Sequence, residues 1–107
     1  MTTQTSPGVL KETTLPVYFT NDIKLTAALI TAGVTLVEAK SRTNPKNSKK
    51  EILFGFEQTD KQQRIAMQFL SGKLSVDAKT LMDNRDSLLS YVTNGSREIL
   101  EKLSSRG

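Results

Sequence analysis

The alternation of side chains in residues 49–57 limits the fold more than any other feature of the chain. Ile52, Phe54 and Phe56 occupy every second position, and glutamates begin and end the intervening set. Since successive side chains of a β-strand point to opposite faces, this pattern predicts a strand with one buried face. Burying the three large side chains stabilises the fold by about 1.5–3 kcal/mol each and leaves both glutamates in water. We therefore expect Phe54 and Phe56 in the core.

The rest of the chain predicts a succession of short strands and helices. Their ends are marked by turn glycines, by the spacing of apolar residues and by capping residues in Thr20-Asn21-Asp22, at Thr59 and at Asp77. The expected elements are a strand at residues 15–19, a helix at 22–32, strands at 34–40 and 49–57, a helix to about residue 70, a short strand at 74–76 and a helix at 77–92. This α+β order is that of a ferredoxin-like split βαβ fold, β-α-β-β-α-β, with a C-terminal helical addition.

Length and composition indicate one folded domain with two less regular ends. A chain of 107 residues, 36% apolar and 24% charged, is typical of a single globular domain. Residues 1–14 are rich in threonine and lack periodicity, which predicts a flexible arm. Residues 15–93 form the expected α+β domain. Residues 94–107 should be a weakly held helical segment, because Asn94 and Gly95 interrupt the preceding helix.

The residue types that are missing exclude several kinds of chemistry. The chain has no histidine and no cysteine, which excludes histidine general bases, thiol nucleophiles and the usual zinc ligands. Its carboxylates are scattered, and no glycine-rich phosphate loop precedes a helix. We therefore expect no enzymatic activity, no cofactor and no metal site. Without a disulfide framework, a signal-like leader or an apolar run of about 18 residues, we expect a cytoplasmic protein with no membrane partner.

The two phenylalanines of residues 49–57 also raise the alternative of a base-stacking surface. Phe54-Gly55-Phe56 resembles the third-strand pattern of RNA-recognition-motif domains, and Tyr18 lies where such a domain has its first-strand aromatic residue. If both phenylalanines faced solvent, however, Ile52 would be exposed with them, and the buried face would carry glutamates. Alternation therefore favours core phenylalanines and leaves Tyr18 as the candidate for stacking.

A second resemblance covers most of the chain, about residues 17–91. Its motifs are Tyr18-Phe-Thr-Asn-Asp22, Ala27-Ala-Leu29, Gly33, Phe54 and Phe56, and then Phe69-Leu-Ser-Gly72, Val76-Asp77 and Leu88-Leu-Ser-Tyr91. In these residues the chain resembles a family of short uncharacterised bacterial and phage-associated proteins, a domain of unknown function. The resemblance implies an accessory role in mobile or bacterial genomes and supplies no site residues.

Most of the excess positive charge lies in the expected hairpin between residues 34 and 57. Five basic residues and two glutamates give the segment from Glu38 to Glu51 a charge of +3, against +4 for the whole chain. The basic residues are Lys40, Arg42, Lys46, Lys49 and Lys50. Such a cluster predicts weak binding to the phosphates of DNA or RNA without sequence specificity, with Tyr18 as a stacking group. Alternatively, the lysines only keep the end of the hairpin soluble.

The face of the expected sheet opposite the core suggests a different function. If Val34 and Leu36 point inward, the opposite face shows Tyr18 and Leu53 together with Thr35, Val37 and Ala39. A face this apolar is covered by the last helix or serves as an interaction surface. The alternative to nucleic-acid binding is therefore a protein-interaction module, an adaptor or phage-type inhibitor, which could be a homodimer through this open face.

Overall fold

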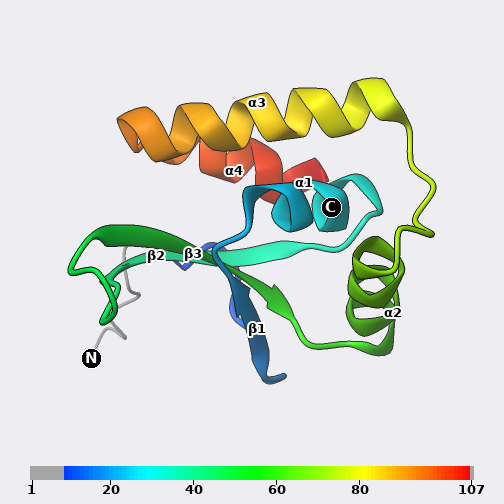
Figure 1. The fold of residues 1–107 in the computed structure, drawn as a ribbon, viewed down its shortest axis with the longest axis horizontal. Coiled ribbons are helices and arrows are strands. Elements are labelled where there is room, and N and C mark those ends of the chain that lie inside the picture. The colour runs from blue at the N-terminus through cyan, green and yellow to red at the C-terminus, as the bar shows by residue number, and fades with distance from the viewer. Residues whose placement is uncertain (1–8, 107) are drawn as a thin grey trace.

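The computed structural model describes residues 9–106, which fold into a three-stranded sheet and four helices (Figure 1). In chain order the elements are β1 (Val17–Thr20), α1 (Ile23–Thr31), β2 (Leu36–Thr43), β3 (Lys50–Glu57), α2 (Asp60–Leu70), α3 (Ala78–Asn94) and α4 (Arg97–Arg106). The sheet is antiparallel with the order β1-β3-β2. Helices α1, α3 and α4 cover one face of the sheet, and α2 lies beside one end (Figure 1). Of the flexible arm expected at residues 1–14, residues 1–8 lie outside the part of the chain that the structure describes.

The first three helices begin at the capping residues that the sequence marks. The carboxylate of Asp22 accepts hydrogen bonds from two backbone N–H groups of α1, and Thr59 Oγ1 accepts one from the N–H of Gln62 in α2. Asp77 caps α3 in the same way. Gly95, with a φ of +69°, ends α3 in the left-handed conformation that glycine adopts without strain, and α4 follows directly.

The core lies between the sheet and the three helices above it. Phe54 and Phe56 have 0% relative exposure, which confirms the inward orientation expected from the alternation of β3. The ring of Phe54 meets the ring of Tyr91 on α3 edge to face, with a centroid distance of 6.1 Å. Leu88 of α3 and Leu100 of α4 belong to the same buried cluster. Phe54 therefore ties the central strand to α3, and α4 contributes to the same core.

The ferredoxin-like pattern is not confirmed, because the described residues contain no fourth strand. The observed order is β-α-β-β-α-α-α, and β3 lies between β1 and β2 as in a split βαβ unit. Residues 74–76, expected to form the missing strand, are an irregular link between α2 and α3. Leu74 packs against the core cluster from this link without a strand partner. Since α2 lies beside the end of the sheet, the link leads up to α3 and does not return along β1 (Figure 1).

The sequence assigned the faces of β1 and β2 wrongly. Tyr18 pairs with Phe56 and packs against the core cluster, whereas Phe19 pairs with Gly55 and lies on the opposite face. In β2 the register shifts between Leu36 and Glu38, which marks a β-bulge. A bulge inserts one residue and so breaks the alternation of side chains. As a result Leu36 and Ala39 both belong to the core, not to opposite faces.

Helix α4 packs on the same face of the sheet as α1 and α3. Leu100 and Leu103 are 1% and 0% exposed, and the hydroxyl of Ser104 donates a hydrogen bond of 2.8 Å to the carbonyl of Leu36 in β2. The sequence suggested that the last helix covers the opposite face of the sheet. The structure shows that it does not. How strongly residues 94–107 are held is a matter of free energy, which truncation of the chain after Gly95 would measure.

Candidate nucleic-acid interface

The loop between β2 and β3 is held in a defined shape by its own polar groups. The backbone N–H of Asn44 donates to the carbonyl of Lys49 at 2.8 Å, and the N–H of Ser48 donates to the carbonyl of Asn44 at 2.9 Å. The side chains of Asn44 and Asn47 accept hydrogen bonds from the backbone N–H groups of Lys46 and Lys49, both at 2.9 Å. Asparagine side chains stabilise turns in this way.

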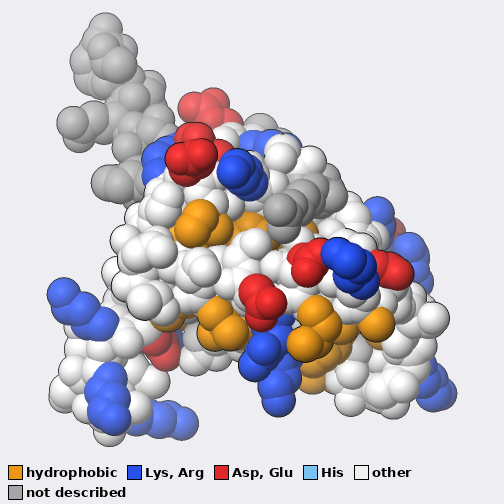
Figure 2. Space-filling view, turned by 90° about the horizontal axis from the view of Figure 1, so that it is seen from above, with side chains coloured by type: hydrophobic (Ala, Val, Ile, Leu, Met, Phe, Trp, Pro, Cys, Tyr) orange, Lys and Arg blue, Asp and Glu red, His pale blue; other side chains and the backbone are white. Residues whose placement is uncertain are grey.

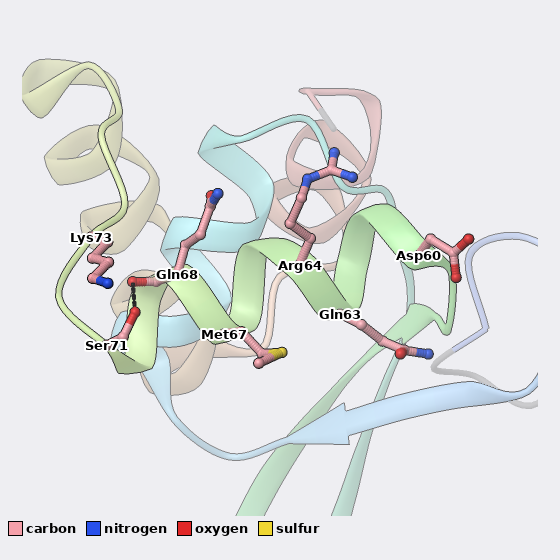
Figure 3. Close-up of a pocket in the computed structure, with 7 residues that line it drawn as sticks. All are labelled: Asp60, Gln63, Arg64, Met67, Gln68, Ser71 and Lys73. Carbon is pink, nitrogen blue, oxygen red and sulfur yellow. Dashed lines mark hydrogen bonds between the residues drawn. The ribbon is translucent and has the colours of Figure 1, made fainter.

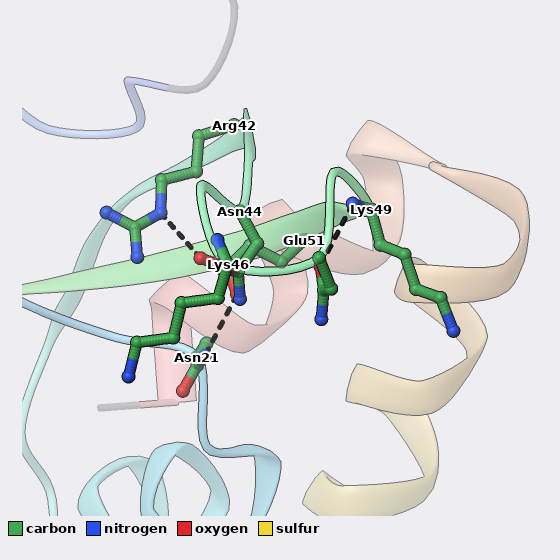
Figure 4. Close-up of polar contacts among 7 residues, drawn as sticks. Asn21, Arg42, Asn44, Lys46, Lys49 and Glu51 are labelled. Atoms are coloured by element: carbon green, nitrogen blue, oxygen red, sulfur yellow. Dashed lines mark hydrogen bonds and ion pairs between the residues drawn. The ribbon is translucent and has the colours of Figure 1, made fainter.

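Glu51 connects this loop to the sheet and to the start of α1. It accepts hydrogen bonds from Asn21 at 3.0 Å and from Asn44 at 3.2 Å, and it forms an ion pair with Arg42 (Figure 4). The hydrogen bond from Asn21 and then that from Arg42 hold the pKa of the Glu51 carboxyl below its usual range. Glu51 therefore stays ionised at neutral pH and neutralises the charge of Arg42.

The five basic residues of the hairpin do not form one flat patch. Lys46 and Lys49 extend in different directions from the loop (Figure 4). Lys50 has the strand parity of Ile52 and Phe54 and so lies on the helix side, whereas Lys40 and Arg42 lie on the opposite face. Acidic and basic side chains are intermixed over much of the surface seen from above, although basic side chains gather at one end of it (Figure 2). The interface suggested by the sequence is therefore divided into the loop with Lys50 on one side and Lys40 with Arg42 on the other.

Sequence reasoning proposed Tyr18 as the stacking group, but it is Phe19 that the structure places beside a basic residue of the hairpin. Tyr18 is half-buried against the core, away from Lys40 and Arg42. Phe19 lies on the same face as Lys40, whose ammonium is 4.1 Å from the centre of the phenylalanine ring. The signal in the sequence was Gly55, because a glycine inside a strand often marks the close approach of another group.

Elsewhere the described residues offer no convergent chemical site. The depression along the outer side of α2 is open, and its polar side chains spread in different directions (Figure 3). Its lining residues are Asp60, Gln63, Arg64, Met67, Gln68, Ser71 and Lys73. Within residues 9–106 no group of acidic side chains could hold a metal ion, and none of the helices is long and apolar enough to cross a membrane.

Comparison with known proteins gives the chain a family but no activity. A family model described as a domain of unknown function (DUF5659) matches residues 16–88, from β1 into α3. The chain belongs to this family. The DUF5659 match confirms the expected resemblance to a domain of unknown function, and it includes the whole β2–β3 hairpin. No curated protein and no solved structure matches the chain significantly.

Proposed function

We propose that this DUF5659 protein is a small cytoplasmic accessory protein, without enzymatic activity, that binds the phosphates of DNA or RNA through the β2–β3 loop. One observation carries the proposal. Lys46, Lys49 and Lys50 lie within five residues at the exposed end of the hairpin, and among residues 9–106 no ion pair engages any of them. Three uncompensated ammonium groups at one end of the molecule favour contact with a polyanion. The accessory role follows the resemblance to bacterial and phage-associated proteins.

The shape of the loop supports phosphate binding over simple solubilisation. A solubilising loop needs charge but no particular conformation. Here Asn44, Asn47 and Glu51 hold the loop through side-chain hydrogen bonds, and Ser48 has a positive φ of 59°. Non-glycine residues adopt such a φ uncommonly. The polar network thus maintains the spacing of the lysine backbones, which lowers the entropic cost of binding a phosphate chain.

The proposal predicts binding that depends on salt and not on sequence. Contacts to phosphates position a protein on nucleic acid but read no bases. If three or four basic groups engage, the slope of log affinity against log salt should be about −2 to −4. Titrations of single- and double-stranded oligonucleotides at several salt concentrations measure this slope.

The decisive variant replaces Lys46, Lys49 and Lys50 together by glutamate. It should abolish binding at moderate salt and leave the melting temperature nearly unchanged, because exposed charges contribute little to stability. A matched control replaces Lys11, Lys24 and Lys73 by glutamate; these lysines are exposed elsewhere and form no ion pair within residues 9–106, so the net charge changes equally. If both triple variants lose affinity to the same extent, binding follows total charge and the loop has no special role. If the wild type binds no oligonucleotide at low salt, the proposal is wrong.

A second candidate function is a protein-interaction module, and α3 provides the observation for it. Met82, Leu89 and Val92 lie along one side of this helix with relative exposures of 52%, 39% and 46%. The view onto α3 from above shows hydrophobic side chains at the surface (Figure 2). The second candidate therefore rests on this stripe of α3 and not on the open sheet face expected from the sequence. Mass measurement during size-exclusion chromatography, with Leu89→Lys as the test variant, distinguishes a dimer through α3 from a monomer.

A further inference from the structure

The face of the sheet away from the helices is divided into a covered half and an open half. Residues 10–16 cross this face: the N–H of Leu10 donates to Val37 of β2, Thr13 donates to the carboxylate of Glu57 in β3, and Pro16 accepts from Gln58 beyond β3. Their passage explains why Val37 is 1% exposed although it does not belong to the main core cluster. Within residues 9–106, no segment crosses the half nearer the hairpin loop.

The open half carries one aromatic ring and a cation above it. Phe19 lies across Gly55, and a Cβ atom at Gly55 would come within 2.8 Å of the Phe19 ring. The ring therefore lies against the backbone of the central strand, and the ammonium of Lys40 is 4.1 Å from the centre of the ring. Lys40 is exposed, so this contact is weak and easily exchanged for another partner of the ring.

The acidic and basic groups of the open half balance one another, and the excess positive charge that suits a nucleic-acid backbone lies in the adjoining loop. Lys40 and Arg42 lie on the open half together with two glutamates: Glu38, which pairs with Gly55, and Glu51, which is engaged by Arg42 and two asparagines. Glu57 lies under the crossing segment, bonded to Thr13. The positively charged loop with Lys46 continues this surface beyond the ends of the strands.

We propose that the open half-face makes this protein selective for single-stranded nucleic acid, with one base stacked on Phe19 and Lys40 moved from the ring to a phosphate. This inference rests on the phosphate binding proposed for the loop and adds a second contact to it. In a duplex both faces of a base are already stacked, so only a single strand offers a free face to the ring. Stacking on an aromatic side chain tolerates any base, which agrees with binding without sequence specificity.

The first test uses the wild-type chain and needs no variant. Three probes are compared at fixed salt: a mixed-sequence single strand of about 12 nucleotides, an abasic strand of the same length, and the corresponding duplex. The base-containing strand should bind about tenfold more tightly than the abasic strand, which carries the same phosphates without a base to stack. Equal affinity for these two strands would overturn the stacking contact and leave the loop proposal intact. Absence of binding to all three probes at low salt would remove both.

The second test assigns the stacking to one ring. Phe19→Leu should reduce the affinity for the base-containing strand to that of the abasic strand without changing the affinity for the abasic strand, and Phe19→Tyr should retain the preference. Phe69→Leu is the control, because it removes a half-buried phenylalanine of α2, on another part of the molecule. Loss of the base preference in Phe69→Leu to the same extent, or its retention in a folded Phe19→Leu protein, would contradict the assignment. A charge reversal of the loop lysines should weaken binding to all three probes alike.

Discussion

Gly55 separates two layers of aromatic side chains. Its neighbours Phe54 and Phe56 fill the core on one side, while Phe19 lies over it on the other. A Cβ atom at this position would lie 2.7 Å from the nearest methyl group of Val17 and 2.8 Å from the Phe19 ring, closer than such contacts allow. Gly55→Ala should therefore lower the free energy of unfolding by about 1–3 kcal/mol, the usual cost of overpacking. Denaturant unfolding measures this loss.

A double-mutant cycle identifies the source of the loss. If the methyl group of the alanine collides with the ring, Gly55→Ala should cost clearly less in a Phe19→Ala background than in the wild type. Equal costs in the two backgrounds would mean that the strand itself resists the substitution and that the contact with Phe19 is unimportant.

Single residues also show how far the sequence determines the faces of the sheet. Phe54 and Phe56 could be assigned to the core because the opposite positions of the same strand carry glutamates. In β1 both faces are apolar, since Val17 and Phe19 alternate with Tyr18. Alternation alone then does not show which of the two faces is buried, and the pairing of β1 with β3 decides this. This uncertainty is the reason that sequence reasoning selected Tyr18, and not Phe19, as the candidate for stacking.

Among the elements, α4 is the one whose importance the sequence understated. Only Ile99, Leu100 and Leu103 of this helix are large and apolar, and the break at Gly95 suggested an independent piece. Two of the three are fully buried beneath α3 and against β2, and together they contribute about 3–6 kcal/mol of burial. A helix with few apolar residues can still complete a core if they all fall on its buried side.

Truncation after Gly95 tests this role of α4. The shortened chain would expose Leu36 and the lower side of Leu88, so we expect a fall of more than 10 °C in the melting temperature, or no cooperative unfolding at all. Circular dichroism during heating measures the change. Glu98→Ala, on the exposed side of α4, is the control and should have little effect. A truncated protein that melts like the full chain would show that residues 94–107 are held weakly, as the sequence predicts.

The misassigned strand at residues 74–76 has a different cause. Leu74 and Val76 alternate as a strand requires, but a segment of three residues forms too few hydrogen bonds to select an edge of the sheet by itself. Its course depends on where α2 packs, which is a tertiary property. The caps of α1, α2 and α3 were recognised correctly because each is a local interaction between a side chain and the following turn.

On the scale of the whole molecule, the candidate site depends on contacts between segments that are far apart in the sequence. The basic residues were found because composition alone reveals them. Their division between the loop and the open half-face, and the neutralisation of Arg42 by Glu51, depend on strand register and on Asn21, thirty positions away from Glu51. Contacts over such distances in the chain leave no periodic signal in a single sequence.

Two carboxylates at opposite ends of the fold make the stability of the whole molecule depend on pH. The pKa of Glu51 is lowered chiefly by the hydrogen bond from Asn21, and the pKa of Asp77 is lowered chiefly by that from the hydroxyl of Thr80. A lowered pKa in the folded state means that the unfolded chain binds protons first as the pH falls. Both groups therefore contribute their full stabilisation above the ordinary carboxyl pKa of about 4, and the contribution disappears as the pH falls through the lowered values.

Substitution of each carboxylate separates its share of this pH dependence. Glu51→Gln and Asp77→Asn should each melt at a lower temperature than the wild type at pH 7, and the difference should shrink toward zero in acid, where the wild-type groups are protonated as well. Melting curves recorded between about pH 7 and pH 2 measure the difference. Glu12→Gln, an exposed glutamate outside both networks, is the control and should follow the wild-type curve. If Glu51→Gln melted below the wild type by the same amount at every pH, the charge of Glu51 would not be what holds the loop to the sheet. The loss would then come from the changed hydrogen-bonding groups of the side chain.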